Sequence, residues 1–394
     1  MLLSGACAAQ TGQARPLAKP KTSHTKADHT PLGLFPAHQL WTLPLNVQLV
    51  APPTFQDLHG FFPIEGGLIV AYDLATGTQM WIVPAAAVSR PAASRDLLFV
   101  VEDGTLEALH VADGSSAWKL PFTEQLAAPL VFDNGWLVAA TTGSSIVAFR
   151  ASDGHLVWRS DIGSPAHAPP TLADDRVYVP AEDGRVVALR VNDGTQVWTH
   201  YLGGAPSEIL ATGDRLFVGS KDNFFYCLKT QDGSVDWPVP TGADVIGLPV
   251  ADAHNVYFVS LDNVLRAVHR GSGNQEWKRV LAVRPTAGPI QAANVILVTS
   301  LSKTLPAFKA SEKGLSAGDL GTGDELASPP HVVTVPGIIG PVVIVVTNDM
   351  LTGATVTAIA RSIEPTATPL APLPGAIMLT PAGPAPLAPP IPKM

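Results

Sequence analysis

Cysteine is nearly absent from this chain of 394 residues, which contains only Cys7 and Cys227. Two distant cysteines cannot form the disulfide framework of a small secreted domain, and no CxxC pair of the kind that binds zinc is present. The sequence also lacks the GxSxG, HExxH, P-loop and EF-hand motifs of common catalytic, nucleotide and calcium sites. We therefore expect no catalytic residues, no bound metal and no cofactor.

Charge is also scarce, because only 15% of the residues are charged, and the net charge is −8 with a pI near 5.7. Nucleic-acid binding relies on clustered Lys and Arg, so we expect no nucleic-acid partner. No apolar run approaches the roughly 20 residues that span a bilayer. Turn-forming residues are abundant instead, with 34 Gly and 37 Pro, which favours many short strands joined by tight turns.

One pattern recurs six times: a small residue, a Gly six positions later, and a Trp four positions after the Gly. The copies are Ala71–Gly77–Trp81, Ala108–Gly114–Trp118, Ala148–Gly154–Trp158, Ala188–Gly194–Trp198, Cys227–Gly233–Trp237 and Ala267–Gly273–Trp277. Successive Trp residues are 37, 40, 40, 39 and 40 positions apart. A fixed period of this length is typical of a repeat architecture.

Each period predicts four strands, most clearly at Pro170–Asp175, Arg176–Pro180, Arg185–Val191 and Thr195–His200. Apolar residues alternate within these segments, and an Asp-Gly turn precedes the last one. Four antiparallel strands per repeat, arranged radially, form the blade of a β-propeller. We expect each Trp to bridge neighbouring blades, and Cys227, at a position otherwise held by Ala, to be a buried thiol.

The same register predicts eight blades, with seven as the alternative. A seventh copy has Ala307, but Lys313 stands where the turn Gly is expected and Gly314 follows one position later. Ala317 stands at the Trp position. An eighth copy has Pro341–Thr347 and Ala354–Ala360 but no outer strand. We expect His38–Pro44 to supply that strand, because Trp41 lies forty residues before Trp81, and to close the ring.

The run from Ala71 to Trp81 resembles the tryptophan-docking motif of the PQQ-like, quinoprotein-type β-propellers, over about residues 38–363. Within these, size and the lack of extra domains make the chain most similar to the BamB outer-membrane assembly lipoprotein family. The resemblance implies a monomeric, non-catalytic scaffold of the cell envelope that binds protein partners, including an outer-membrane assembly complex. At the position of the motif residue Asp73, the next five copies have other residues instead: His110, Arg150, Arg190, Lys229 and His269.

Two other functions stay open at this point. One is a PQQ-dependent dehydrogenase, for which the resemblance implies a longer chain, a calcium site and a pair of adjacent cysteines. The other is a ligand-sensing propeller that works beside a signalling protein. Short connections between the blades and the missing cysteine pair favour the scaffold.

Four acidic residues stand in the turns between the second and third strands of their blades, and they are Asp103, Asp183, Asp222 and Asp262. Ring symmetry would place them on one face, which could present negative charge to a basic partner. Asp-Gly and Asp-Asn are also common hairpin turns, so a purely structural role competes with this hypothesis.

The two ends differ from the repeats. Residues 1–7 resemble a truncated lipoprotein signal that ends at Cys7, the candidate lipidation site, although the apolar stretch is short and Leu3 lies one position too far from the cysteine. Lipidation would tether the protein to the periplasmic face of the outer membrane; a cytoplasmic or secreted soluble protein is the alternative. Residues 8–36 are expected as a flexible tether, 37–363 as the propeller and 364–394 as a Pro/Ala-rich disordered tail.

Overall fold

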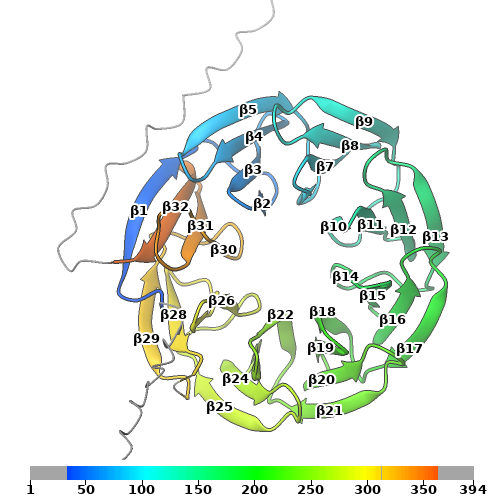
Figure 1. Ribbon diagram of the computed structural model, residues 1–394, viewed down its shortest axis with the longest axis vertical. Helices are drawn as coiled ribbons and strands as arrows, with labels where there is room; N and C mark the ends of the chain where they lie inside the picture. The colour runs from blue at the N-terminus through cyan, green and yellow to red at the C-terminus, as the bar shows by residue number, and fades with distance from the viewer. Residues whose placement is uncertain (1–32, 312, 363–394) are drawn as a thin grey trace, which may run out of the picture. The chain divides into compact units, whose positions relative to one another are not determined.

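The chain forms an all-β ring of eight blades, each a sheet of four antiparallel strands (Figure 1). The structure is a computed structural model, and it describes residues 33–311 and 313–362. No helix occurs in these residues, and therefore none that could cross a membrane. The prediction of eight blades rather than seven is confirmed.

The first four blades follow one another along the chain. Blade 1 contains β2 (Thr54–Gln56), β3 (His59–Ile64), β4 (Leu68–Asp73) and β5 (Thr78–Pro84). Blade 2 contains β6 (Ala92–Ala93), β7 (Leu97–Glu102), β8 (Thr105–His110) and β9 (Ser116–Pro121). Blade 3 contains β10 (Val131–Asp133), β11 (Trp136–Ala140), β12 (Ser145–Arg150) and β13 (Leu156–Asp161). Blade 4 contains β14 (Thr171–Ala173), β15 (Arg176–Pro180), β16 (Arg185–Arg190) and β17 (Gln196–Tyr201).

The next three blades continue the order, and the eighth joins both ends of the ring. Blade 5 contains β18 (Pro206–Thr212), β19 (Arg215–Ser220), β20 (Phe224–Lys229) and β21 (Val235–Pro240). Blade 6 contains β22 (Val245–Ala251), β23 (Asn255–Ser260), β24 (Val264–His269) and β25 (Gln275–Val280). Blade 7 contains β26 (Ile290–Ala292), β27 (Val295–Leu297), β28 (Thr304–Lys309) and β29 (Ser316–Gly321). Blade 8 contains β30 (His331–Val333), β31 (Val342–Asp349), β32 (Gly353–Arg361) and β1 (Ala37–Pro44).

The strand β1 closes the ring, as the sequence predicts, by pairing antiparallel with β32. Trp41 of β1 lies opposite Ala358, which repeats the small-residue/Trp pairing of the other blades, such as Ala188 opposite Trp198. Because the first and last strands of the described chain share one sheet, blade 8 joins the two ends of the propeller and closes the ring.

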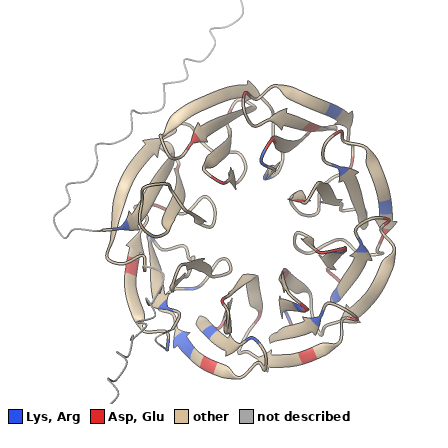
Figure 2. Ribbon diagram, in the orientation of Figure 1, with Lys and Arg blue, Asp and Glu red and all other residues tan. Residues whose placement is uncertain are grey.

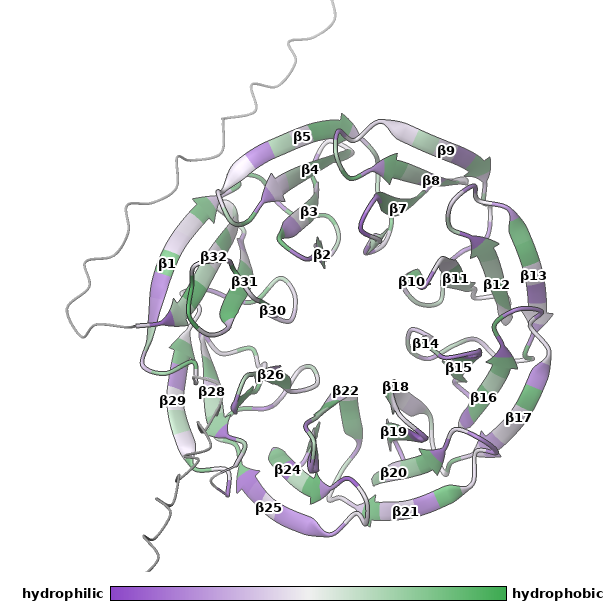
Figure 3. Cartoon of the chain, viewed as in Figure 1, coloured by the Kyte–Doolittle hydropathy of each residue, from purple (hydrophilic) through white to green (hydrophobic). Residues whose placement is uncertain are grey.

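Hydrophobic residues fill the two middle strands of each blade, whereas the outer strands alternate between polar and apolar side chains (Figure 3). The core is therefore a series of layers between adjacent blades, and each layer is built from inward-facing residues of two sheets. One such layer joins Val138 and Trp158 of blade 3 to Val177 and Val191 of blade 4.

The departures from the motif at Asp73 have a local explanation. Asp73 accepts backbone hydrogen bonds from Ala75 (2.8 Å) and Thr76 (3.2 Å) at the start of its turn. In later copies a different Asp, directly before the turn Gly, takes this role: Asp193, for example, accepts the N–H of Thr195 at 2.9 Å. The turn keeps its Asx hydrogen bond although the first position has changed.

Candidate functional site

The predicted docking tryptophans lie in the outer strands, where each ring packs against the turn Gly of the next blade. A Cβ on Gly194 would lie 2.7 Å from Cδ2 of Trp158, and one on Gly233 would lie 2.7 Å from Cζ3 of Trp198. The six predicted turn glycines, Gly77, Gly114, Gly154, Gly194, Gly233 and Gly273, have φ between 68° and 72°. The left-handed backbone favours Gly at all six positions, and at the five from Gly114 to Gly273 the Trp ring of the preceding blade also leaves no room for a Cβ.

The indole N–H groups add a second link between the blades. Nε1 of Trp81, Trp118, Trp158, Trp198 and Trp277 donates to the backbone carbonyl of Val111, Ala151, Val191, Thr230 and Ala310, respectively. Each carbonyl belongs to the first residue of the turn that holds the docking Gly. The predicted bridging of adjacent blades by Trp is therefore visible as a hydrogen bond and a packed ring in the same place.

Trp237 is the exception, because its buried Nε1 has no hydrogen-bond partner among the described residues. The carbonyl at the equivalent position belongs to Arg270, and it accepts a hydrogen bond from Nη1 of Arg215 at 3.3 Å instead. Arg215 of blade 5 therefore donates to the carbonyl that accepts the indole N–H in the other repeats.

Blade 7 lacks a docking Trp, and the structure corrects the residue that stands in its place. Its turn is one residue longer than the others, so Gly318, rather than the predicted Ala317, lies opposite Ala307. Gly314, with φ 68°, still docks the ring of Trp277. A Cβ on Gly318 would lie 3.1 Å from Cε1 of Phe35. The ring of Phe35 therefore lies beside β29 at the position where the outer strands of other blades carry their Trp.

Residues 33–36, the end of the predicted tether, are part of the packed ring. Leu34 is fully buried, and Nη1 of Arg361 donates to the carbonyls of Gly33 (2.9 Å) and Phe35 (2.7 Å). The remaining predictions for the ends fall outside the described residues: the signal at 1–7 with Cys7, the tether up to residue 32, and the tail at 364–394.

One face of the ring, here called the loop face, is built from the connections between blades and the turns between second and third strands. It comprises residues 45–53, 65–67, 85–91, 103–104, 122–130, 141–144, 162–170, 181–184, 202–205, 221–223, 241–244, 261–263, 281–289, 298–303, 322–330 and 350–352. Backbone hydrogen bonds tie the two kinds of segment together, such as Lys221 N to Ala205 O at 3.0 Å. The two kinds of segment therefore form one surface.

The four predicted acidic residues all lie on the loop face, but three of them have internal partners. Asp222 accepts hydrogen bonds from the N–H of Gly203 (2.8 Å) and the hydroxyl of Tyr226 (2.6 Å). Asp262 accepts from the N–H of Gly242 (2.9 Å) and pairs with Arg266 (2.6 Å), and Asp183 pairs with Arg185 (2.6 Å). Their recognition of a basic partner stays a prediction.

The pKa values of these carboxyl groups follow their contacts. Burial acts to raise the pKa of Asp262, but hydrogen bonds from Arg266 and Ser260 outweigh it and lower the pKa to about 2. Hydrogen bonds from the Arg185 side chain hold the pKa of Asp183 below its usual value. Both groups are therefore anionic at neutral pH with their charge already compensated. Charged side chains of both signs are spread around the ring (Figure 2).

Chemistry that would need a reactive thiol or a metal finds little support in these residues. Burial raises the pKa of the Cys227 thiol to about 12, as expected for a core cysteine. Between residues 33 and 362, Glu312 aside, no three His, Cys, Asp or Glu side chains gather in a group that could hold a metal ion.

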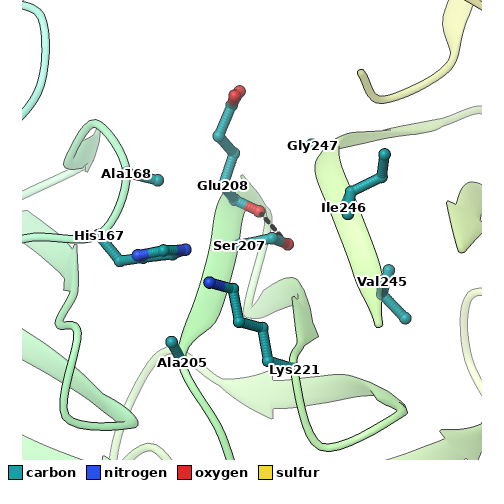
Figure 4. A pocket seen from close by; sticks show the side chains of 9 residues that line it. All are labelled: His167, Ala168, Ala205, Ser207, Glu208, Lys221, Val245, Ile246 and Gly247. Atoms are coloured by element: carbon teal, nitrogen blue, oxygen red, sulfur yellow. Dashed lines mark hydrogen bonds between the residues drawn. The ribbon is translucent and has the colours of Figure 1, made fainter. Parts of the chain in front are cut away.

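The site that sequence reasoning missed is a cavity of about 180 Å³ on the loop face, between blades 4, 5 and 6 (Figure 4). Its polar lining residues are His167, Ser207, Glu208 and Lys221. They come from three separate segments of the chain and carry no common motif, so only the ring brings them together.

Comparisons with known proteins agree with the propeller. The family described as outer membrane protein assembly factor BamB matches residues 102–212 and 202–334. No curated protein sequence matches the chain. Among solved structures, BamB from Moraxella catarrhalis superposes with a TM-score of 0.67 at 16% identity, over 82% of this chain and 99% of that one.

Two further solved structures share the fold but have different origins. The computationally designed Ika8 protein gives a TM-score of 0.66 at 16% identity, over 81% of this chain and 98% of that one. The quinohemoprotein alcohol dehydrogenase ADHIIG from Pseudomonas putida HK5 gives 0.65 at 14% identity, over 87% of this chain and 80% of that one. At these identities the likenesses establish the fold and leave the activity open.

Proposed function

Because the chain belongs to the family of the outer membrane protein assembly factor BamB, we propose that it is a non-catalytic scaffold of the cell envelope that binds protein partners in outer-membrane protein assembly. The observation that carries this proposal is the concentration of exposed apolar side chains on the loop face. A rigid ring that presents such side chains is suited to holding a partner without changing it chemically.

Exposed large hydrophobic residues are distributed unequally between the faces. Leu301 (73% exposed), Met350 (91%) and Leu351 (95%) lie in the turns of blades 7 and 8 on the loop face. Others on the same face or at strand ends beside it are Val50, Val88, Tyr201 and Val280. The opposite face and the strand ends beside it have Leu315 and Ile339 in turns and Leu156, Val157 and Val235 at the starts of outer strands, and none of these is more than 55% exposed. Exposed apolar side chains gathered on one face are typical of interaction surfaces.

The charge of the loop face defines the chemistry of the partner. Its acidic residues are Glu65, Asp103, Glu124, Glu182, Asp183, Asp222, Asp244, Asp262, Asp324 and Glu325, and its basic residues are Arg90, Lys221, Arg284 and Lys303. The turns of the opposite face are acidic as well, so the apolar side chains, rather than charge alone, distinguish the loop face. The partner that fits has a basic surface with apolar side chains at its centre.

A lipid anchor at Cys7 belongs to the same proposal and would place the protein at the periplasmic face of the outer membrane. The described chain enters the ring at Gly33 and leaves it at Ser362, and both residues lie at the side opposite the loop face. An anchor and tether attached there would leave the loop face accessible to a partner.

Co-purification under native conditions tests the proposal. The full-length protein is expected to retain a barrel-assembly outer-membrane protein, and a Leu301→Ser/Leu351→Ser variant is expected to lose it while Leu315→Ser/Ile339→Ser keeps it. Mass spectrometry of the mature N-terminus should find a lipidated Cys7. A free Met1 in the soluble fraction, together with no assembly partner, would contradict the envelope function.

The likeness to quinohemoprotein dehydrogenases raises a second candidate, a PQQ-dependent enzyme. The described residues do not fit PQQ and its metal ion. They include no cluster of acidic or His side chains that could hold a metal ion, and their single cysteine, Cys227, is buried in the core. Incubation with PQQ and Ca²⁺ separates the candidates. Alcohol oxidation coupled to a dye would favour the enzyme, and a protein that stays inert would favour the scaffold.

A further inference from the structure

Two adjacent inner strands break the regularity of the ring. The inner strands β18 and β22 have seven residues each, whereas the other six have two or three. Both contain a bulge: the register shifts between Pro206 and Ile209 in β18, and between Ile246 and Val250 in β22. Bulges in a repeated architecture redirect side chains locally and are frequent beside functional sites.

The bulges create the cavity at His167 and Lys221 (Figure 4). Ser207 and Glu208, the two residues of β18 that lie opposite the single residue Gly219 of β19, both line it. Gly219 on the neighbouring strand makes room for this arrangement, because a Cβ there would lie 2.6 Å from Cβ of Val245 and 2.8 Å from Oγ of Ser207. Glycine at 219 and the bulge at 207–208 are thus two parts of one local structure.

The two ends of the cavity carry opposite charges that are not paired with each other. Lys221 and His167 point toward one another at one end, and the Glu208 carboxylate extends toward the other end (Figure 4). Within the described chain, neither Nζ of Lys221 nor the carboxylate of Glu208 has an ion-pair partner within 4.0 Å. The neighbouring Asp222 is bound to Gly203 and Tyr226 instead of Lys221.

The titration behaviour of the lining agrees with this polarity. Burial, followed by the charge of Lys221, lowers the pKa of His167, so its ring is neutral at pH 7 and can donate one N–H. Burial raises the pKa of Glu208, with Arg90 acting against it, as expected for a carboxylate that has lost water without gaining a partner. A cationic group placed at Glu208 would remove this penalty.

We propose that the cavity binds a small zwitterion of the amino-acid class, with its carboxylate between Lys221, His167 and Ser207 and its ammonium group at Glu208. The Ser207 hydroxyl accepts a hydrogen bond from the N–H of Gly219 at 3.1 Å and donates a long one, 3.5 Å, to the carbonyl of Glu208, which a shorter bond to a ligand oxygen would replace. Ala168, Ala205, Val245 and Ile246 form an apolar wall for an aliphatic side chain.

The size of the cavity suits a small ligand. At about 30 Å³ per water molecule, 180 Å³ corresponds to roughly six waters, which is enough for a small aliphatic amino acid. This binding function goes beyond the proposed scaffold function. It does not depend on the exposed apolar side chains of the loop face, from which the scaffold function is argued.

Isothermal titration calorimetry with L-valine, N-acetyl-valine and valinamide tests the proposal on the full chain. Valine is expected to bind, and each capped form, which lacks one of the two charges, should bind at least about tenfold more weakly. Lys221→Met and Glu208→Gln should weaken valine binding to a similar degree. Lys229→Met, which changes an exposed lysine at the opposite face, is the matched control and should bind as the unmodified protein does.

Three results would overturn the proposal: no binding of valine, equal binding of valine and N-acetyl-valine, or valine binding that Lys221→Met leaves unchanged. Circular dichroism and thermal melting of each variant identify one that has failed to fold. In that case Lys221→Arg, which keeps the charge, replaces Lys221→Met, and its binding should remain within about tenfold of the unmodified protein.

Discussion

The indole of Trp158 rests directly on Gly194 of the next blade, and its N–H donates to the carbonyl of Val191 at 2.6 Å. The same pair of contacts recurs at Trp81, Trp118, Trp198 and Trp277, so in these repeats one Trp and one Gly fix both the spacing and the orientation of neighbouring sheets. The first predictions test this relationship.

Gly194→Ala should destabilise the fold by roughly 2–4 kcal/mol, because the new Cβ would collide with Trp158 and the left-handed backbone disfavours any side chain. Gly135→Ala is the matched control: φ is 85° there, but nothing lies within 4 Å of the new Cβ. The control should cost only about 1 kcal/mol of backbone strain. Urea unfolding measures both, and equal losses would contradict the docking role of Gly194.

Trp158→Phe should cost about 1 kcal/mol more than Trp237→Phe. Both substitutions remove similar ring area, but only the Trp158 N–H has a hydrogen-bond acceptor, whereas the Trp237 N–H is buried without one in the described part of the chain. The comparison is again made by urea unfolding. A larger loss of unfolding free energy for Trp237→Phe than for Trp158→Phe would show that the Trp237 N–H has a hydrogen-bond acceptor in solution.

The sequence was sufficient to predict the period, the eight blades and the closing strand, since Gly and Trp have fixed roles in each repeat. In blade 4 the predicted strand Arg176–Pro180 coincides with β15, and the neighbouring strands differ by one or two residues at their ends. The error at Ala317 came from a turn that is one residue longer, which moves the register of β29 to Gly318.

Contacts between distant segments could not be predicted from the repeat. Phe35 lies far from Gly318 in sequence, and no periodic signal connects them. The cavity depends on two bulges, and the position of a bulge is set by packing against the next blade rather than by local sequence. His167, Glu208 and Lys221 therefore had no recognisable pattern before the ring was known.

Phe35→Ala should lower stability by about 2–3 kcal/mol, because it empties the space beside Gly318 in the blade that has no docking Trp. Met350→Ala, at a side chain that is 91% exposed, is the control and should leave the unfolding midpoint unchanged. Similar midpoints for the two variants would contradict the packing of Phe35 in blade 7.

Lowering the pH should reduce the free energy of unfolding in part through protonation of the Asp262 carboxylate. Its folded-state pKa of about 2 is below the unfolded value, so its contribution is complete above the unfolded pKa and is lost as the pH falls toward 2. Asp262→Asn should therefore destabilise the protein at pH 7 and have a much smaller effect near pH 2. Denaturant titrations at the two pH values measure this, and a pH-independent effect would show that the Arg266 pair does not depress the pKa.

The central claim, that the loop face binds a protein partner, is tested most directly by site-specific photo-crosslinking in cells. A photoreactive amino acid replaces Leu351 or Leu301 on the loop face, or Ile339 on the opposite face as the control. Crosslinks from Leu351 and Leu301 to a barrel-assembly outer-membrane protein, with none from Ile339, are the predicted result. Crosslinks from Ile339 alone would contradict the account.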